Sequence, residues 1–187
     1  MKIGLISDTH SAGSGRDLPG RVLKAMAGVD LILHCGDLEC LGVLDYLESV
    51  APVLAVRGYE DPREPGDRLA EATRVVQAEG LAIGMVHDIQ WPGPRIDTSG
   101  DGTRLKFPGN GVRDLMRRKF GQPVDVVVYG DTHEELVCVS DGVLVVNPGS
   151  PTYPGRRHRP GSLGTLGLLE VEGATASVTL LDLEHTS

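Results

Sequence analysis

The chain has 187 residues, 40% of them hydrophobic, and a formal net charge of −8 at pH 7. That length suits one globular domain, so we expect a single domain over residues 1–187. The acidic balance argues against strong nucleic-acid binding, which needs a basic face. No apolar run is long enough to span a membrane. Three cysteines without a C-x-x-C spacing indicate free thiols, so we expect a cytoplasmic protein.

Short apolar runs alternate with helical patterns in the first third of the chain. We expect strands over 2–7, 30–35 and 52–57, with helices over about 18–28 and 41–49 between them. This alternation is typical of βαβ units and a parallel sheet.

Antiparallel pairs dominate the rest of the chain. Residues 73–79 and 81–87 predict a hairpin, and a helix at about 111–120 precedes a strand at 124–129. Two more hairpins follow, 135–140 with 143–147 and 164–173 with 175–183. Asp141-Gly142 in the first of these favours a type I′ turn. The antiparallel strands would build a second sheet or widen the first, giving a two-layer β core with helices outside.

Metal-binding side chains recur where predicted strands stop. They occur at Asp8-Thr9-His10, Gly36-Asp37, Gly58-Tyr59-Glu60-Asp61, His87-Asp88, Gly130-Asp131-Thr132-His133 and Asn147-Pro148-Gly149-Ser150. Strand C-termini line the ligand crevice of an open α/β sheet, so these side chains can converge. Oxygen and imidazole ligands suit Mn²⁺, Fe²⁺, Co²⁺ or Zn²⁺, and the absence of thiolates excludes a structural zinc knuckle. The pattern predicts a metal site used for chemistry.

The order D-x-H, G-D, G-x-x-D, H, G-x-x-H and NPGS is similar to that of the calcineurin-like metallophosphoesterases, especially their small bacterial and archaeal phosphodiesterase branch. The resemblance runs from Asp8 to about Arg156. It implies an α/β fold, a four-layer αββα sandwich of two mixed β-sheets flanked by helices. It also implies two metals, the first held by Asp8, His10, Asp37 and His133 and the second by His87, with Asp37 bridging.

The chain departs from this family pattern at the second metal. Tyr59 replaces an asparagine ligand, Glu60 replaces a histidine or cysteine, and Asp131 replaces a histidine; the family's H-G is His87-Asp88. We expect Asp131 to serve as a metal ligand. Its extra negative charge would weaken the metals as Lewis acids and favour harder ions such as Mn²⁺ or Mg²⁺. Tyr59 is a poor ligand unless a metal deprotonates it.

The resemblance implies a metal-dependent phosphoesterase that hydrolyses a phosphodiester or phosphomonoester by a metal-activated hydroxide. We expect a small phosphorylated substrate and one or two divalent ions per chain, Mn²⁺ first, with Mg²⁺, Fe²⁺, Co²⁺, Ni²⁺ or Zn²⁺ as alternatives. The candidate catalytic residues are Asp37, Glu60 and Asp88, and the candidate phosphate contacts are Tyr59 and Arg156. The alternative is a degenerate, non-catalytic relative that binds or scaffolds a partner, like the retromer-subunit branch of the family.

Residues 91–111 are rich in Gly and Pro and leave directly from His87-Asp88. A loop of this length is usually functional or disordered, so it is either a lid carrying Trp91 and Arg95 or a surface insertion. The basic run 156–159 also lies in a Pro/Gly loop, where it either meets substrate phosphate or is solvated.

Overall fold

The computed structural model describes residues 1–63, 68–109 and 111–186. Its first sheet has five strands in the order β12-β11-β1-β2-β3. Their bounds are Thr175–Asp182 (β12), Thr165–Glu172 (β11), Lys2–Ile6 (β1), Leu31–His34 (β2) and Val53–Ala55 (β3). The strands β1, β2 and β3 are parallel, as the alternating pattern predicts, and the C-terminal hairpin β11–β12 widens this sheet on the β1 side.

The second sheet also has five strands, in the order β4-β5-β8-β10-β9. Their bounds are Thr73–Ala78 (β4), Leu81–Val86 (β5), Val126–Val128 (β8), Val143–Asn147 (β10) and Leu136–Ser140 (β9). Parallel strands β5, β8 and β10 form its centre, and β4 and β9 are antiparallel edges. Asp141 and Gly142 join β9 to β10 with φ of 48° and 74°, the positive values that a type I′ turn requires.

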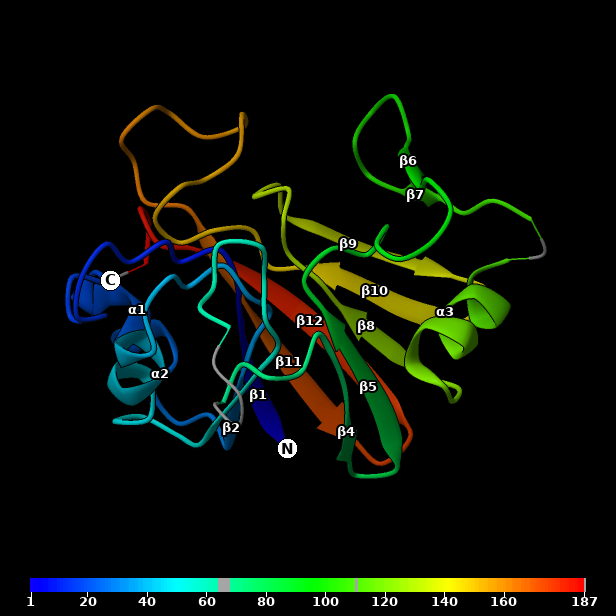
Figure 1. The fold of residues 1–187 in the computed structure, drawn as a ribbon, viewed down its shortest axis with the longest axis horizontal. Coiled ribbons are helices and arrows are strands. Elements are labelled where there is room, and N and C mark those ends of the chain that lie inside the picture. Colours follow the sequence, from blue (N-terminus) through cyan, green and yellow to red (C-terminus); the bar gives the residue numbers. More distant parts are fainter. Residues whose placement is uncertain (64–67, 110, 187) are drawn as a thin grey trace.

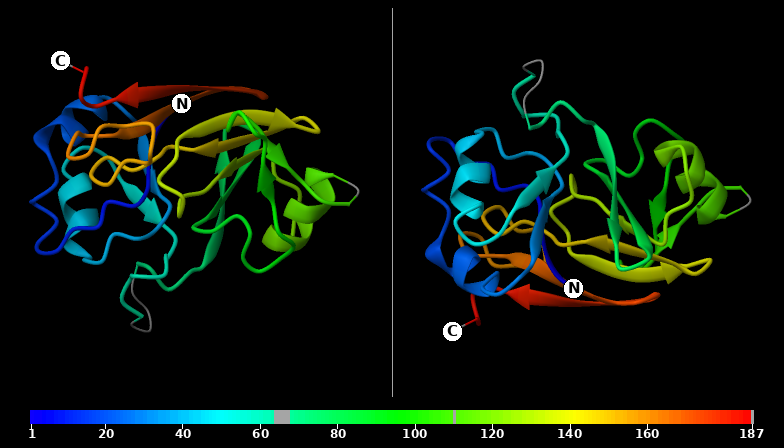
Figure 2. Two further views of the ribbon diagram at one scale, coloured as in Figure 1. Left: turned by 90° about the horizontal axis from the view of Figure 1, so that it is seen from above. Right: turned by 90° about the horizontal axis from the view of Figure 1, so that it is seen from below.

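Helices cover the outer faces of both sheets (Figures 1 and 2). Helices α1 (Gly20–Ala25) and α2 (Gly42–Leu47) pack on the first sheet, and α3 (Val112–Phe120) packs on the second. The four-layer αββα sandwich is therefore confirmed. Both α1 and α2 are shorter than the predicted helices; Pro19 directly precedes α1, where its missing N–H costs nothing.

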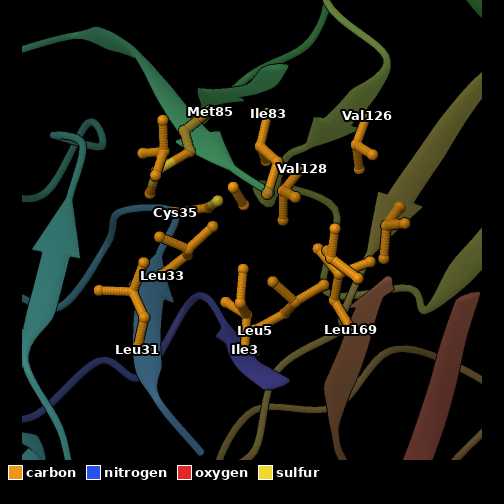
Figure 3. Close-up of a cluster of buried hydrophobic side chains, with 14 of the residues drawn as sticks. Ile3, Leu5, Leu31, Leu33, Cys35, Ile83, Met85, Val126, Val128 and Leu169 are labelled. Carbon is orange, nitrogen blue, oxygen red and sulfur yellow. The ribbon is translucent and has the colours of Figure 1, made fainter. Parts of the chain in front are cut away.

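A hydrophobic core between the two sheets joins them (Figure 3). Alternation along β1 directs Ile3 and Leu5 into this core, where they meet Ile83 and Met85 of β5. All four side chains are completely buried. Burial of each such side chain contributes roughly 1.5–3 kcal/mol, which holds the two sheets together and brings their strand ends to one edge.

The Gly/Pro-rich segment contains a short hairpin that the sequence did not predict, β6 (Asp97–Thr98) with β7 (Leu105–Lys106). Ile96 is buried and packs with Leu105 and Phe107 against the second sheet, beside α3. Arg95 forms an exposed ion pair with Asp97, and Trp91 lines a cavity with His87, so the choice between a lid and a surface insertion stays a prediction. Asn110, inside the predicted loop, lies outside the described residues. Within the described ranges, no helix is long and apolar enough to cross a membrane.

Candidate metal centre

The loops after β1, β2, β5 and β8 bring five of the six predicted metal ligands together. Two groups of possible ligand atoms form, each with all its atoms within 4.8 Å of one another: Asp8 with His10 and His133, and Asp8 with Asp37 and His87. The His87 Nε2 to Asp37 Oδ2 distance is 3.1 Å, and the His133 Nε2 to Asp8 Oδ1 distance is 3.6 Å. Asp8 belongs to both groups. The family resemblance implies a different shared residue, Asp37, as the bridge between the two metals.

All three histidines of this centre are anchored through Nδ1. The partners are Glu39 Oε1 for His10 at 2.8 Å, the Cys35 carbonyl for His87 at 2.8 Å and the Tyr153 carbonyl for His133 at 2.6 Å. Each partner is an acceptor, so each Nδ1 keeps its proton and donates it in a hydrogen bond. In the neutral ring this leaves the lone pair on Nε2, directed into the centre. This is the arrangement that metal-ligating histidines adopt.

Two observations show that the centre fits a divalent ion. The Nε2 atoms of His10 and His133 face each other at 3.2 Å, yet the anchoring of both rings leaves each with a lone pair. Two lone pairs repel unless a proton or a metal lies between them. His87 Nε2 is buried and lies 3.1 Å from Asp37 Oδ2 without a well-formed hydrogen bond. A metal bound by these two atoms would satisfy both of them.

The backbone at the predicted ligands is held in an unusual conformation. Five of the eight non-glycine residues with positive φ in the described ranges are predicted ligands: Asp8, His10, Asp37, Asp131 and His133. Such conformations cost of order 1–3 kcal/mol each and persist only where neighbouring structure imposes them. Hydrogen bonds between the loops do so here, from Asp8 N to Gly36 O at 2.9 Å and from His10 N to Asp37 O at 3.0 Å.

Glycines allow the closest approaches in the centre. A Cβ at Gly58 would collide with the Asp37 carboxylate, and one at Gly130 would collide with the Asp8 carboxylate. These glycines therefore let the loops of the two sheets approach the acidic side chains directly.

Asp61 positions the centre without facing it, a role that the sequence analysis missed. Its buried carboxylate accepts four backbone N–H bonds, from Asp37 (2.9 Å), Leu38 (2.7 Å), Glu39 (2.8 Å) and Gly58 (2.7 Å). It thereby joins the loop after β2 to the loop after β3. The only signal in the sequence was its place at the end of the G-x-x-D motif.

The NPGS segment also supports the centre. Asn147 Nδ2 donates to the Gly130 carbonyl at 2.9 Å and to Thr132 Oγ1 at 3.0 Å. Ser150 Oγ donates to the Asp8 carbonyl at 2.7 Å. These bonds fix the backbone on either side of the centre. Asn147 and Ser150 therefore position the loops that carry the candidate ligands.

The charges of the centre are coupled. Burial lowers the pKa of His87, but the nearby Asp37 and Asp8 carboxylates outweigh that effect and raise it to about 9. Burial raises the pKa of Asp37, but its contact with His87 and the Glu60 N–H bond hold it below its ordinary value. Burial raises the pKa of Asp8. Without metal, the His87 ring is therefore protonated on both nitrogens at neutral pH, and a metal must displace the Nε2 proton.

Tyr59, at the position of the family's asparagine, does not point its hydroxyl at the centre. The hydroxyl donates to Asp88 Oδ2 at 2.8 Å, and the ring lies edge-on to His87 with 5.5 Å between centroids. Burial and the Asp88 carboxylate raise the pKa of Tyr59 to about 12, so the phenol stays protonated. In this geometry the Tyr59 hydroxyl is not a metal ligand, and its predicted contact with substrate phosphate stays a prediction.

Two further predicted residues contribute backbone groups to the centre. The Asp131 N–H lies 3.2 Å from both Asp8 carboxylate oxygens, and its own Oδ1 is 3.8 Å from His87 Nε2, outside both ligand groups. Glu60 donates its N–H to Asp37 Oδ1 at 3.0 Å, while its side chain is exposed.

Arg156 lies beside the centre. It lines a surface depression with Asp131, His133 and Tyr153, and its N–H donates to Glu134 Oε1 at 2.7 Å. Its guanidinium makes no ion pair with any described residue. Within the same basic run, His158 Nε2 contacts Glu135 Oε2 at 3.2 Å, a partner that the sequence gave no reason to expect.

Comparisons with known proteins agree with this geometry. A family model described as the calcineurin-like phosphoesterase superfamily domain matches residues 1–174. A probable metallophosphoesterase of Methanocaldococcus jannaschii is 35% identical over 159 residues, 82% of this chain and 70% of that protein. A phosphodiesterase of the same organism is 30% identical over 158 residues, 80% of this chain and 83% of that protein.

Among solved structures, a single mutant of Vps29 from Entamoeba histolytica superposes with a TM-score of 0.67 at 20% identity. The match covers 97% of this chain and 99% of the other. At that identity the likeness concerns the fold alone. The family model and the two relatives lead to one assignment: the chain belongs to the calcineurin-like phosphoesterase superfamily.

Proposed function

We propose that the protein is a metal-dependent phosphoesterase that hydrolyses a phosphodiester or phosphomonoester in the cytoplasm. One observation carries the proposal: three anchored imidazoles and two carboxylates form two adjacent groups of ligand atoms that share Asp8. The set Asp8, His10 and His133 would hold one divalent ion, and Asp8, Asp37 and His87 a second. Mixed nitrogen and oxygen ligands suit Mn²⁺ best and admit Fe²⁺, Co²⁺, Ni²⁺ or Zn²⁺, while Mg²⁺ prefers oxygen.

The protein's own groups have defined tasks in this reaction. A bound dication supplies a Lewis acid for a phosphoryl oxygen and lowers the pKa of water. Arg156, beside the centre with its charge unpaired, binds the non-reacting phosphate oxygens. The Tyr59 hydroxyl donates its single proton to Asp88 in this structure; with substrate bound, it turns that hydrogen bond to a phosphate oxygen. Asp37 is held in place by Asp61 and keeps the His87 ring oriented.

Metal content and turnover, measured on the same sample, test the proposal. The protein is stripped with a chelator, reloaded with Mn²⁺, analysed for bound metal and assayed with bis-p-nitrophenyl phosphate. Turnover that depends on added Mn²⁺ supports a hydrolase. Full metal occupancy without turnover would refute it.

Variants assign the ligands within that assay. We expect Asp8→Ala and His133→Ala to weaken Mn²⁺ binding more than Asp131→Ala does, because Asp131 stands outside both ligand groups. Asp125→Asn is the matched control, since among the described residues the Asp125 carboxylate accepts only the Ala82 N–H, at the other end of the second sheet. If Asp131→Ala proves the most damaging change, the ligand assignment is wrong.

A second candidate function, a non-catalytic binding protein, has one observation in its favour. The Tyr59 side chain stands where the family supplies a metal ligand, and its hydroxyl is turned to Asp88. This leaves the Asp8, Asp37 and His87 group one donor short. Under this alternative, the reloaded protein would hold one ion per chain and hydrolyse neither an activated diester nor p-nitrophenyl phosphate.

A further inference from the structure

Exposed aromatic side chains gather around the metal centre. Five large hydrophobic residues are exposed in the described ranges, and three of them are aromatic: Tyr59 (50% exposed), Trp91 (66%) and Tyr153 (56%). The other two, Val137 and Val139, lie on the edge strand β9. Scattered exposed apolar residues need no explanation, but three aromatic rings beside one site do.

These aromatic residues lie on two sides of the centre. On one side, Tyr59 is edge-on to His87, and both residues line a cavity of about 140 Å³ together with Trp91. On the other side, Tyr153 is edge-on to His10 with 5.3 Å between centroids. His87 belongs to one ligand group and His10 to the other, so each group has an aromatic neighbour of its own.

Hydrogen bonds to the backbone or hydroxyl anchor the three aromatic residues. The Tyr59 hydroxyl is bound to Asp88. The Tyr153 carbonyl accepts the His133 Nδ1 proton, and the Tyr153 N–H donates to Ser150 Oγ at 2.9 Å. Lys119 Nζ donates to the Trp91 carbonyl at 2.7 Å. Much of each ring therefore stays exposed to solvent while its backbone or hydroxyl is fixed, which lowers the entropy cost of binding a flat ligand.

From this arrangement we propose that the substrate is a phosphodiester with a planar aromatic group on each ester arm. One group stacks on Tyr59 and Trp91, the other on Tyr153, and the phosphate lies between them at the metal centre. A cavity of ~150 Å³ accommodates one benzene ring, so the Tyr59–Trp91 cavity fits a single ring. A monoester has only one organic arm and would leave one aromatic side unused. This inference rests on the proposed function, because it names the substrate class of that site.

Binding measurements test the inference separately from turnover, since Trp91 is the only tryptophan of the chain. The Mn²⁺-loaded protein is titrated with diphenyl phosphate, methyl phenyl phosphate and dicyclohexyl phosphate, with Trp91 fluorescence as the signal. Stacking on aromatic side chains contributes ~1–3 kcal/mol per ring, so we expect diphenyl phosphate to bind at least ~10-fold more tightly than either other diester. Dicyclohexyl phosphate matches it in size and charge but is not flat.

Substitutions locate the two aromatic sides. Tyr59→Leu and Tyr153→Leu keep apolar bulk and leave Trp91 as the reporter. We expect each to weaken diphenyl phosphate binding about 10-fold and to change dicyclohexyl phosphate binding less than about twofold. Val139→Ala, an exposed apolar change on β9, is the matched control and should leave both affinities unaltered.

Each opposite result overturns the inference. Equal binding of diphenyl and dicyclohexyl phosphate would exclude stacking, and equal binding of diphenyl and methyl phenyl phosphate would exclude a second aromatic side. Absence of any saturable Trp91 response would exclude both. Tight diphenyl phosphate binding in a protein that fails to hydrolyse bis-p-nitrophenyl phosphate would refute the hydrolase proposal and leave the aromatic diester site standing.

Discussion

Replacing Asp61 by asparagine tests how the metal centre is built. Each Asp61 oxygen accepts two backbone N–H bonds, Oδ2 from Asp37 and Gly58 and Oδ1 from Leu38 and Glu39. Asparagine keeps one accepting oxygen and turns an NH₂ group toward the other pair of N–H donors. Two charge-assisted bonds are therefore lost, each worth roughly 1.5–3 kcal/mol, and two buried donors are left without acceptors.

We expect Asp61→Asn to lower the free energy of unfolding by about 3–5 kcal/mol, a large part of the ~5–15 kcal/mol typical of a domain. Urea unfolding of the metal-free protein measures this as a lower midpoint at an unchanged slope. Because the Asp37 N–H is one of the four donors, we also expect Mn²⁺ affinity to fall at least ~10-fold, a size seen for groups that orient metal ligands.

Asp125→Asn is the matched control, because that half-buried carboxylate accepts a single backbone bond, from Ala82 at 2.9 Å. The amide oxygen of asparagine can still accept it, so we expect a loss under about 1 kcal/mol. If Asp61→Asn costs no more than Asp125→Asn and binds Mn²⁺ as the native chain does, the four-bond account of this loop is refuted.

Three further predictions concern charge and the second metal position. Without metal, His87 has a pKa of about 9, so below that pH the Mn²⁺ affinity should fall up to tenfold for each unit of acidification. Calorimetry near pH 7 should show about one proton released for each site that binds metal. An affinity that does not change with pH would contradict this. Burial lowers the pKa of His34 to about 4, so the unfolded state binds its proton first, and the His34 contribution to metal-free stability should drop on the order of 2 kcal/mol from pH 7 to pH 5, partly offset by the raised pKa of His87. His34→Asn should lose much of that pH dependence in urea unfolding, and an unchanged dependence would exclude His34 as its source. The double variant Tyr59→Asn and Asp131→His restores the family's ligands. It should raise the Mn²⁺ affinity roughly 10-fold and increase the turnover of bis-p-nitrophenyl phosphate. If both values stay unchanged, the assignment of the second metal position is wrong.

Strand periodicity and strand-end residues predicted most of the fold. The parallel strands, the three hairpins and α3 follow from local pattern and turn chemistry, and both sheets have the expected mixed character. The β6–β7 hairpin was missed because two-residue strands leave no period to detect; the neighbouring Ile96 is buried beside them. Asp61 was passed over as a site residue because nothing in a motif distinguishes a carboxylate that binds metal from one that binds N–H groups.

Position along the chain likewise predicted which side chains meet but not what each of them does there. The sequence placed Tyr59 and Asp131 at the second metal, and both are close to His87. It could not show that the Tyr59 hydroxyl donates its hydrogen bond to Asp88, because that bond depends on the direction of the side chain. It also gave no reason to group Tyr153 with Trp91 and Tyr59, which are far from it in the chain.

The candidate ligands come from both halves of the sandwich: Asp8, His10 and Asp37 follow strands of the first sheet, whereas His87 and His133 follow strands of the second. An ion held by both sets would cross-link the two sheets at the end opposite their hairpin turns. At a free concentration 100 times its Kd, such an ion adds about 2.7 kcal/mol to stability. Cellular metal supply would then govern the protein's lifetime as well as its chemistry.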